Sequence, residues 1–244
     1  MELIITEDYA SLSRAAADIV CNAVSAKPNA VVVLPTGSSP VGLFKELIAR
    51  HRAGSFDPSR LRIFQMDDYY PVEPTNPNSL YAWLKSEFLD PLGIRPEQIV
   101  ELPGNAADPV AACRHYDELL SQAGGYDLAV LGLGPNGHIG FNDPPATATA
   151  PTRVLDLSES SIATGSKSWG SREATPKQAI SAGMQQLLGA RQIVLIVSGE
   201  HKRQILKQSL QGPVTPDVPA SYLQQTANVT VIADHAAWPK TTTN

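Results

Sequence analysis

The sequence contains little cysteine, few aromatic residues and no long apolar run. Its two cysteines, Cys21 and Cys113, are too few for a disulfide framework and do not form a metal-ligand cluster. No apolar stretch approaches the roughly 18 residues that a membrane-spanning helix needs. The N-terminus lacks a basic region followed by an apolar stretch, so we expect no signal peptide. These absences favour a cytoplasmic protein and give no indication of a bound metal.

Positive charge is scarce as well. Lysine and arginine number 19 against 24 acidic residues, the net charge is −5, and no basic cluster is present. This balance argues against nucleic acid or an anionic membrane as the main partner. A small anionic ligand is still compatible, because it needs only a local cationic pocket. No linker divides the sequence, so we expect a single domain over residues 1–244.

Strand and helix patterns alternate along the chain. This alternation predicts an α/β fold: a Rossmann-like, doubly wound, mostly parallel sheet with helices on both faces. Right-handed crossovers place the carboxyl ends of the strands at one edge. The predicted strands are Leu3–Thr6, Ala30–Leu34, Leu61–Met66, Asp127–Gly132, Gln192–Val197 and Val229–Ala233. The predicted helices are Leu12–Ala23, one capped by Ser39 with Pro40 in its first turn, Ser79–Leu89, Pro109–Gln122, Pro176–Leu188 after Thr175, and Glu200–Leu210.

Residues 145–175 differ in composition from the rest of the chain. They are rich in Ala, Thr, Ser, Gly and Pro, with one short apolar stretch at Val154–Leu157. Loops of this length in compact domains are often lids. We therefore expect a lid here.

Residues able to bind anions follow two of the predicted strands. The stretch LPTGSSP, Leu34–Pro40, runs through Gly37 and two serines into a helix start, where N–H groups and hydroxyls make an anion site. It matches neither the Walker loop nor the dinucleotide-binding glycine pattern. In VSGEHKRQ, Val197–Gln204, Lys202 is placed to reach a phosphate. The alternatives are an ordinary capped helix start and a solvated helical lysine.

Residues able to move protons follow two other strands. In FQMDDYYP, Asp67 and Asp68 are adjacent, and the alternation of side chains lets only one face the ligand crevice, where a carboxylate can act as a general base. In LGLGPNGHIGFNDPP, Leu131–Pro145, His138 can exchange protons near neutral pH and Asp143 can orient its ring. The alternatives are loop-capping carboxylates and a histidine that satisfies backbone groups. Together the four strand ends predict proton transfer on a small phosphorylated molecule, without a nucleotide site or a nucleophile elbow.

These four segments, in this order, resemble the glucosamine-6-phosphate deaminases, a sugar-phosphate isomerase family that also includes 6-phosphogluconolactonases. The resemblance runs from LPTGSSPVGLFKEL through QMDDYYPVEPTNPNSLYAWL, TPKQAISAGMQQLL and SGEHKRQIL to the last strand. Deaminases carry Gly-His-Ile-Ala/Gly-Phe-Asn-Glu-Pro where this chain has GHIGFNDP, and lactonases carry Gly-His-Thr-Ala-Ser-Leu-Phe-Pro. The residues after His138 therefore favour the deaminases.

The resemblance implies conversion of glucosamine 6-phosphate to fructose 6-phosphate and ammonia in amino-sugar catabolism, without a cofactor. By this resemblance Asp67 moves the proton from C2 to C1, His138 helps to open the sugar ring and Asp143 orients His138. The phosphate contacts it implies are Ser38, Ser39 and Lys202, in a loop shaped by Thr36 and Gly37, with Asp68 and Gly137 also at the substrate site. Lys167 and Arg172 both remain candidates for the phosphate-binding residue of the lid.

Two site positions depart from the commonest family pattern. Asn136 stands where many deaminases have aspartate. Asp143 stands where glutamate is usual, so a backbone shift or a water must restore its contact with His138. The long C-terminal extension of the allosteric, hexameric members is missing, so we expect a monomer or small homo-oligomer without amino-sugar allostery. A lactonase and a non-catalytic sugar-phosphate-binding regulator are the alternative functions.

Overall fold

The computed structural model describes residues 1–238, so the last six residues of the expected domain, 239–244, lie outside the described part. The strands are β1 (Glu2–Thr6), β2 (Val31–Leu34), β3 (Arg62–Gln65), β4 (Asp67–Tyr70), β5 (Ile99–Val100), β6 (Leu128–Gly132), β7 (Arg153–Asp156), β8 (Gln178–Ser181), β9 (Gln192–Val197) and β10 (Val229–Asp234). The α-helices are α1 (Tyr9–Ala26), α2 (Val41–Arg52), α3 (Leu80–Leu84), α4 (Pro109–Gln122), α5 (Glu159–Trp169), α6 (Met184–Leu188) and α7 (Arg203–Gln211). A π-helical turn, Lys85–Leu89, continues α3, and 3₁₀ turns cover Asp90–Leu92, Pro96–Gln98, Glu200–Lys202 and Pro219–Gln225.

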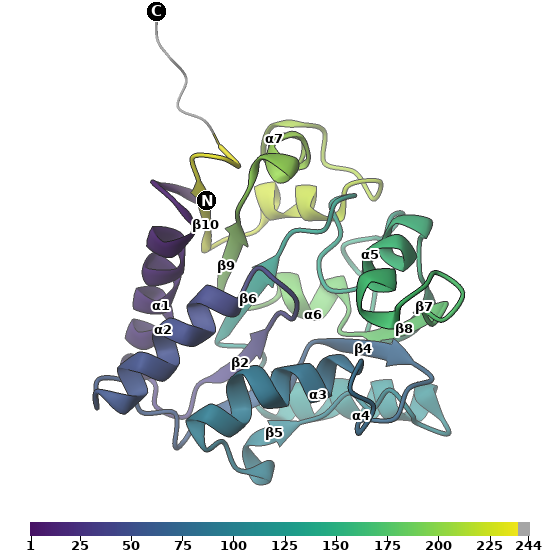
Figure 1. Ribbon diagram of the computed structural model, residues 1–244, viewed down its shortest axis with the longest axis horizontal. Helices are drawn as coiled ribbons and strands as arrows, with labels where there is room; N and C mark the ends of the chain where they lie inside the picture. Colours follow the sequence, from purple (N-terminus) through teal and green to yellow (C-terminus); the bar gives the residue numbers. More distant parts are fainter. Residues whose placement is uncertain (239–244) are drawn as a thin grey trace, which may run out of the picture.

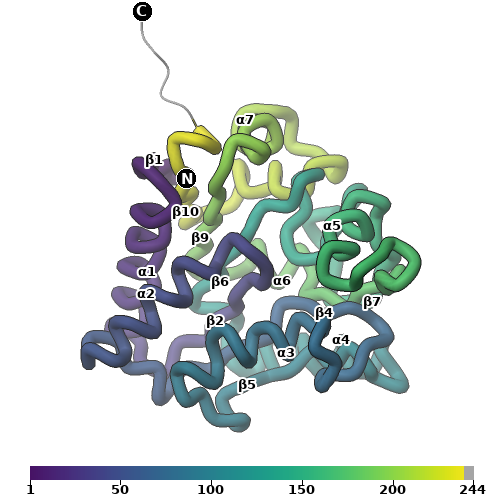
Figure 2. The backbone as a smooth tube through the Cα atoms, in the orientation of Figure 1, coloured from purple at the N-terminus to yellow at the C-terminus, as the bar shows by residue number. Residues whose placement is uncertain are grey.

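The main sheet has seven parallel strands in the order β1-β10-β9-β6-β2-β3-β5. The first and last strands of the chain are therefore neighbours, with Leu3 paired to Val231, and Figure 2 shows β1 and β10 side by side. In this order β3 and β5 lie on one side of β2, whereas β6, β9, β10 and β1 lie on the other side. The direction in which the chain adds strands therefore reverses between β2 and β6. Such a reversal opens a crevice at the carboxyl ends of the strands.

Two apolar cores cover the two faces of this sheet, which confirms the expected α/β fold (Figure 1). On one face α1, α2, α3 and the following π-helical turn pack against alternating residues such as Val32 and Val130. On the other face α4, α6 and α7 pack against the intervening residues, such as Val33 and Leu131. The alternation follows from the two-residue period of a strand. Helices on both faces explain why the central strands β2 and β6 are apolar along their whole length.

A second, antiparallel sheet has the order β4-β8-β7. It shows that the helix expected over Pro176–Leu188 is wrong: residues 178–181 form β8, and only Met184–Leu188 is helical. Thr175 does not cap a helix, because its hydroxyl donates to the Ser171 carbonyl oxygen. Pairing with both β4 and β7 buries Ala179 and Ile180 completely, and this nonlocal contact overrides the helical pattern of the sequence.

Residues 145–175, which the sequence predicts to be a lid and which are called the lid segment below, carry β7 and α5. A small core of Tyr69, Leu157, Ile162 and Ala179, with Val72, attaches α5 to the second sheet. The apolar stretch at Val154–Leu157 thus belongs to a strand and to this core. Within residues 1–238, none of the helices combines the length and the hydrophobicity of a membrane span.

Candidate active site

The four chemistry-bearing segments follow neighbouring strands of the main sheet. They come after β9, β6, β2 and β3, which are consecutive in the sheet order. Because the strands are parallel, their carboxyl ends meet at one edge, beside the reversal between β2 and β6. Residues far apart in the sequence are brought together there.

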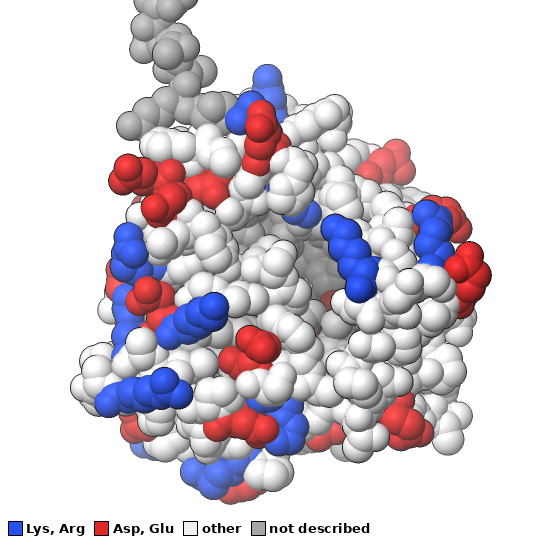
Figure 3. Space-filling view, in the orientation of Figure 1, with Lys and Arg blue, Asp and Glu red and all other residues white. Residues whose placement is uncertain are grey.

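A cavity of about 270 Å³ opens at this edge. The predicted site residues that line it are Thr36, Gly37, Ser38, Ser39, Asp67, His138 and Lys202. Thr164, Gly165 and Ser168 of α5 close its outer side, so the lid helix forms one wall. Figure 3 shows the surface hollowed between the strand ends and α5, with basic side chains at the edge of the hollow.

Asp67 is a buried carboxylate with little to stabilise its charge. Its side chain accepts no hydrogen bond from any residue of the described chain, and Oδ1 is fully buried without a partner. Burial, and secondarily the nearby charge of Asp68, raises the pKa of Asp67 to about 7. A carboxyl group with this pKa and a free oxygen is suited to taking up and releasing a proton near neutral pH.

Asp68 lies on the same strand in opposite surroundings. Its carboxylate accepts hydrogen bonds from the Ser79 hydroxyl at 2.7 Å, from the Gln65 amide at 3.2 Å, and from the N–H groups of Tyr69, Leu80 and Tyr81 at 2.8, 2.8 and 3.1 Å. It is 1% exposed and does not line the cavity. Asp68 therefore connects the start of α3 to β4 through hydrogen bonds, whereas Asp67 faces the cavity.

The Asp143 carboxylate holds the His138 ring through Nδ1 and leaves the other ring nitrogen, Nε2, available. His138 Nδ1 lies 2.7 Å from Asp143 Oδ1. Burial alone would raise the pKa of Asp143, but the hydrogen bond and charge of His138, with further donors, lower the pKa well below its usual range. An ionised Asp143 can only accept, so Nδ1 carries a hydrogen and Nε2 is the nitrogen available for exchange. The contact is direct, so the shorter aspartate needs no bridging water.

Glycine at position 134 makes room for this imidazole. A Cβ on Gly134 would lie 2.1 Å from Cδ2 and 2.2 Å from Nε2 of His138. Atoms cannot approach this closely, so any side chain here would displace the ring.

Asn136 and the lid complete the surroundings of Asp143. The Asn136 side-chain amide donates to Asp143 Oδ1 at 2.9 Å, and the Ser161 hydroxyl donates to the same oxygen at 2.9 Å. The N–H of Ser158 donates to Asp143 Oδ2 at 2.9 Å. The first turn of α5 is thus attached to the carboxylate that orients His138. Sequence reasoning missed both serines, and the only signal for them was the run of small hydroxyl residues in the lid.

The loop after β2 differs from its expected form. The helix begins at Val41, and its N-cap position is occupied by Pro40, whose side chain makes no capping hydrogen bond. The capping role expected of Ser39 is therefore wrong. Gly37 has a φ of +87°, which favours glycine. In the described chain the N–H groups of Gly37, Ser38 and Ser39 donate to no protein acceptor, and they are free to bind an anion.

Lys202 reaches the cavity from the turn after β9. Its Nζ donates to the Leu133 carbonyl oxygen at 2.6 Å, and burial lowers its pKa. Asp234, at the end of β10, supports this turn by accepting hydrogen bonds from the Ser198 hydroxyl at 2.5 Å and from the Gly199 N–H at 3.1 Å. The ammonium group is therefore held beside the β6 loop that carries His138.

The remaining predicted residues lie outside the cavity wall. Arg172 is exposed and forms an ion pair with Glu159, and Lys167 is exposed on α5. Gly137 has a φ of +85°, and a Cβ there would lie 2.8 Å from Val218, so it shapes the β6 loop.

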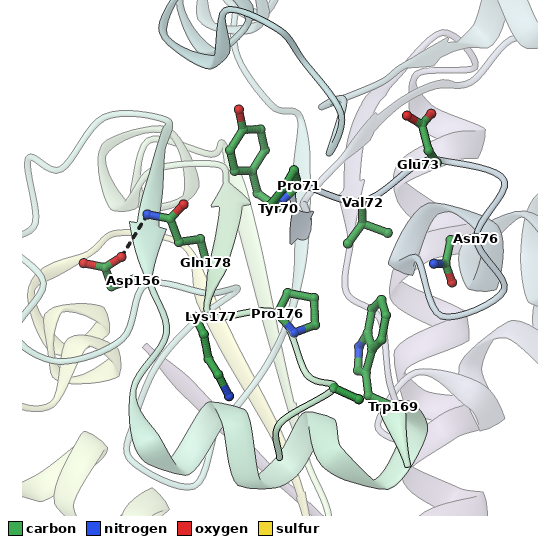
Figure 4. A pocket seen from close by; sticks show the side chains of 11 residues that line it. Tyr70, Pro71, Val72, Glu73, Asn76, Asp156, Trp169, Pro176, Lys177 and Gln178 are labelled. Atoms are coloured by element: carbon green, nitrogen blue, oxygen red, sulfur yellow. Dashed lines mark hydrogen bonds between the residues drawn. The ribbon is translucent and has the colours of Figure 1, made fainter. Parts of the chain in front are cut away.

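A larger cavity of about 720 Å³ lies on the other side of the lid (Figure 4). Figure 4 shows Trp169, Pro176 and Val72 along its wall, and Gln178 hydrogen-bonded to Asp156. Trp169 packs edge-on against Tyr69, which lines the smaller cavity, so this aromatic pair separates the two. The larger cavity contains none of the catalytic candidates.

Comparison with known proteins gives a consistent result. The model of the glucosamine-6-phosphate isomerases/6-phosphogluconolactonase family matches residues 7–232. The chain belongs to this family. A glucosamine-6-phosphate deaminase of Halothermothrix orenii is 39% identical over 237 residues, which cover 97% of this chain and 98% of that protein. Glucosamine-6-phosphate deaminase 2 of Bacillus subtilis is 40% identical over 242 residues, covering 98% and 97%.

Solved structures of the family show the same fold. A monomeric glucosamine-6-phosphate deaminase has a TM-score of 0.94 and 32% identity, covering 97% of this chain and 98% of its own. A 6-phosphogluconolactonase from Trypanosoma cruzi has a TM-score of 0.78 and 19% identity, covering 99% and 97%. The resemblance seen in the sequence motifs is thereby confirmed, and at 19% identity the lactonase shares the fold alone.

Proposed function

We infer that this protein is a glucosamine-6-phosphate deaminase, which converts glucosamine 6-phosphate to fructose 6-phosphate and ammonia. The observation that carries this function is one cavity that brings three groups together. These are the Asp67 carboxylate, which has no hydrogen-bond partner among residues 1–238, the His138 ring oriented by Asp143, and the loop of Ser38 and Ser39, whose N–H groups can bind an anion. The relatives with 39% and 40% identity over nearly the whole chain are deaminases.

The geometry supports a division of roles. The loop of Ser38 and Ser39, with Lys202, binds the phosphate and so fixes the sugar in the cavity. His138 exchanges a proton through Nε2 as the ring opens, and its charge is stabilised by Asp143. Asp67 takes the proton from C2 and returns it to C1, so the carboxylate ends the transfer as it began. Water then replaces nitrogen at C2, and ammonia leaves.

The test is a coupled assay of purified protein with millimolar glucosamine 6-phosphate. We expect fructose 6-phosphate and ammonia in equal amounts. Absence of turnover would contradict the proposal. Binding of the sugar phosphate without turnover would identify a regulator instead, and hydrolysis of 6-phosphogluconolactone would identify a lactonase.

Lys167 is the lid residue that we propose as a phosphate ligand. It lies on α5 between Thr164 and Ser168, which line the cavity, whereas Arg172 is paired with Glu159. Replacing Lys167 by alanine should raise KM about threefold to tenfold through one lost charged contact, and the same change at Arg172 should leave KM unchanged. The opposite ranking would assign the role to Arg172.

We also propose that the protein acts as a monomer. The support is the 0.94 TM-score to a deaminase that is described as monomeric. Sedimentation equilibrium should give the mass of one chain, and the mass of a dimer or larger assembly would contradict the monomer.

A further inference from the structure

One side chain from α1 contacts the loop that we propose as the phosphate site, residues 36–39, without lining the cavity itself. Tyr9 is the first residue of α1, and its hydroxyl oxygen accepts a hydrogen bond from the Gly42 N–H at 2.7 Å. The same hydroxyl lies 3.0 Å from the carbonyl oxygens of both Ser38 and Ser39, and these two acceptors share its single hydrogen. Tyr9 does not line the cavity. We propose that Tyr9 is a positioning residue that sets the anion affinity of this loop.

Tyr9 supplies the cap that α2 lacks. No side chain of the Pro40 segment caps this helix, so one of its first N–H groups is left for another partner. The Tyr9 hydroxyl binds the N–H of Gly42, the second residue of the helix. It thereby does the work expected of an N-cap side chain, and it leaves the hydroxyls of Ser38 and Ser39 free to face a ligand.

Tyr9 also determines which way a loop amide points. The C=O of one residue and the N–H of the next point in opposite directions across a planar trans peptide. Because the Ser38 carbonyl oxygen is held on the Tyr9 side, the Ser39 N–H points to the opposite side, where Ser39 lines the cavity. A rotation of this peptide would present a carbonyl oxygen to an anion, which repels it.

The position of Tyr9 is itself fixed. Asp8 caps α1 by accepting a hydrogen bond from the Ser11 N–H at 2.7 Å, and the Ser13 hydroxyl donates to the Tyr9 carbonyl oxygen at 2.7 Å. At Gly42 the two helices are in contact, since a Cβ there would lie 2.1 Å from the Ser13 hydroxyl oxygen and 3.0 Å from the Tyr9 ring. The loop is therefore held against a helix that carries no catalytic residue.

The test replaces Tyr9 by phenylalanine, which removes the hydroxyl and keeps the ring. The inference rests on the proposed function in taking this loop as the phosphate site, so two ligands are measured. These are glucosamine 6-phosphate by steady-state kinetics, and inorganic phosphate by calorimetry on the free enzyme. Loss of one hydrogen-bonding group should raise KM and the Kd of phosphate about threefold to tenfold. We expect kcat to change less than about twofold, because Asp67 and His138 come from other strand ends.

A control variant separates this effect from a general loss of stability. In Tyr70→Phe a hydroxyl that donates to the Ala106 carbonyl oxygen at 3.0 Å is lost beside the other cavity. This variant should retain the KM and Kd of the unaltered protein, and melting temperatures of both variants show that each is folded.

The outcomes distinguish the two proposals. Unchanged KM and Kd in folded Tyr9→Phe, or a fall in kcat with KM unchanged, would overturn the positioning role while leaving the deaminase function intact. If the unaltered protein fails to turn over glucosamine 6-phosphate, a weaker phosphate Kd in Tyr9→Phe alone still supports the role of Tyr9. An unaltered protein that binds no phosphate at all would overturn the inference.

Discussion

Asp67 and Asp68 are consecutive residues of the short strand β4, and their carboxylates meet opposite surroundings. Asp67 lies in the cavity without a hydrogen-bond donor among the described residues, whereas Asp68 accepts five hydrogen bonds, three of them from Ser79, Leu80 and Tyr81 at the start of α3. Burial raises both pKa values, but only in Asp68 do donors from Ser79, Leu80 and Tyr81 oppose the rise. The difference shows how one strand can hold a carboxylate without donors next to one that is fully hydrogen-bonded.

The largest expected effect is on catalysis by Asp67. The Asp67→Asn variant keeps the shape of the side chain but cannot take the C2 proton. We expect kcat to fall about 10³- to 10⁴-fold while substrate binding is retained, because loss of a general base has effects of this size. Asp57→Asn, an exposed change at the other end of the sheet, serves as the control in the ammonia assay. Near-normal turnover of Asp67→Asn would make the base assignment wrong.

The same substitution should stabilise the protein in a pH-dependent way. The folded-state pKa of Asp67 is raised to about 7, so its protonated form favours folding, and that stability is lost as the pH rises from about 4 through 7. The neutral asparagine avoids this loss. Urea unfolding should give Asp67→Asn an advantage near zero at pH 4 and about 2–4 kcal/mol at pH 8. An advantage that does not change with pH would contradict the raised pKa.

Asp68→Asn should have the reverse effect on stability. An amide places an NH₂ group among donors that need an acceptor, so hydrogen bonds to Ser79 and the α3 backbone are lost. We expect a loss of about 1–3 kcal/mol in the free energy of unfolding at pH 7. Turnover by the folded fraction should stay within about tenfold of the unaltered protein, because Asp68 is only a neighbour of the base. A fall in turnover as large as that of Asp67→Asn would place both carboxylates in the chemistry.

The smallest effect is a shift in the pH profile. The charge of Asp68 contributes to the raised pKa of Asp67, so Asp68→Asn should lower that pKa. The rise of kcat/KM with pH, centred near 7 in the unaltered protein, should move to lower pH by less than about one unit. Asp57→Asn should leave the profile in place, and a shift to higher pH in Asp68→Asn would contradict the electrostatic coupling.

Local sequence patterns predicted six of the seven strands of the main sheet and the edge at which they end, but not the two-residue strand β5. The apolar runs at Leu128–Gly132 and Gln192–Val197 are strands, and the residues after them meet at one cavity because parallel strands end together. The two-residue period of a strand also predicted that only one carboxylate of the Asp67–Asp68 pair would face the crevice. The resemblance to the family indicated which one.

The second sheet could not be predicted from local sequence patterns. Its strand β8 has a helical sequence pattern and forms only because β4 and β7 pair with it on either side. For the same reason the sequence could not assign Ser158 and Ser161 to Asp143, since the lid reaches the β6 loop through tertiary packing. The role of Tyr9 depends on a contact between two helices and has no sequence signal of its own.

The most direct test of the account is the titration of the Asp67 carboxyl group. Protein with ¹³C-labelled aspartate carboxyls is followed by NMR over pH, and the Asp67 signal is the one missing from Asp67→Asn. A midpoint near pH 7 in the free enzyme is the predicted result. A midpoint near 4, the ordinary value for aspartate, would show a solvated or hydrogen-bonded carboxylate and contradict the role of Asp67 as a buried base.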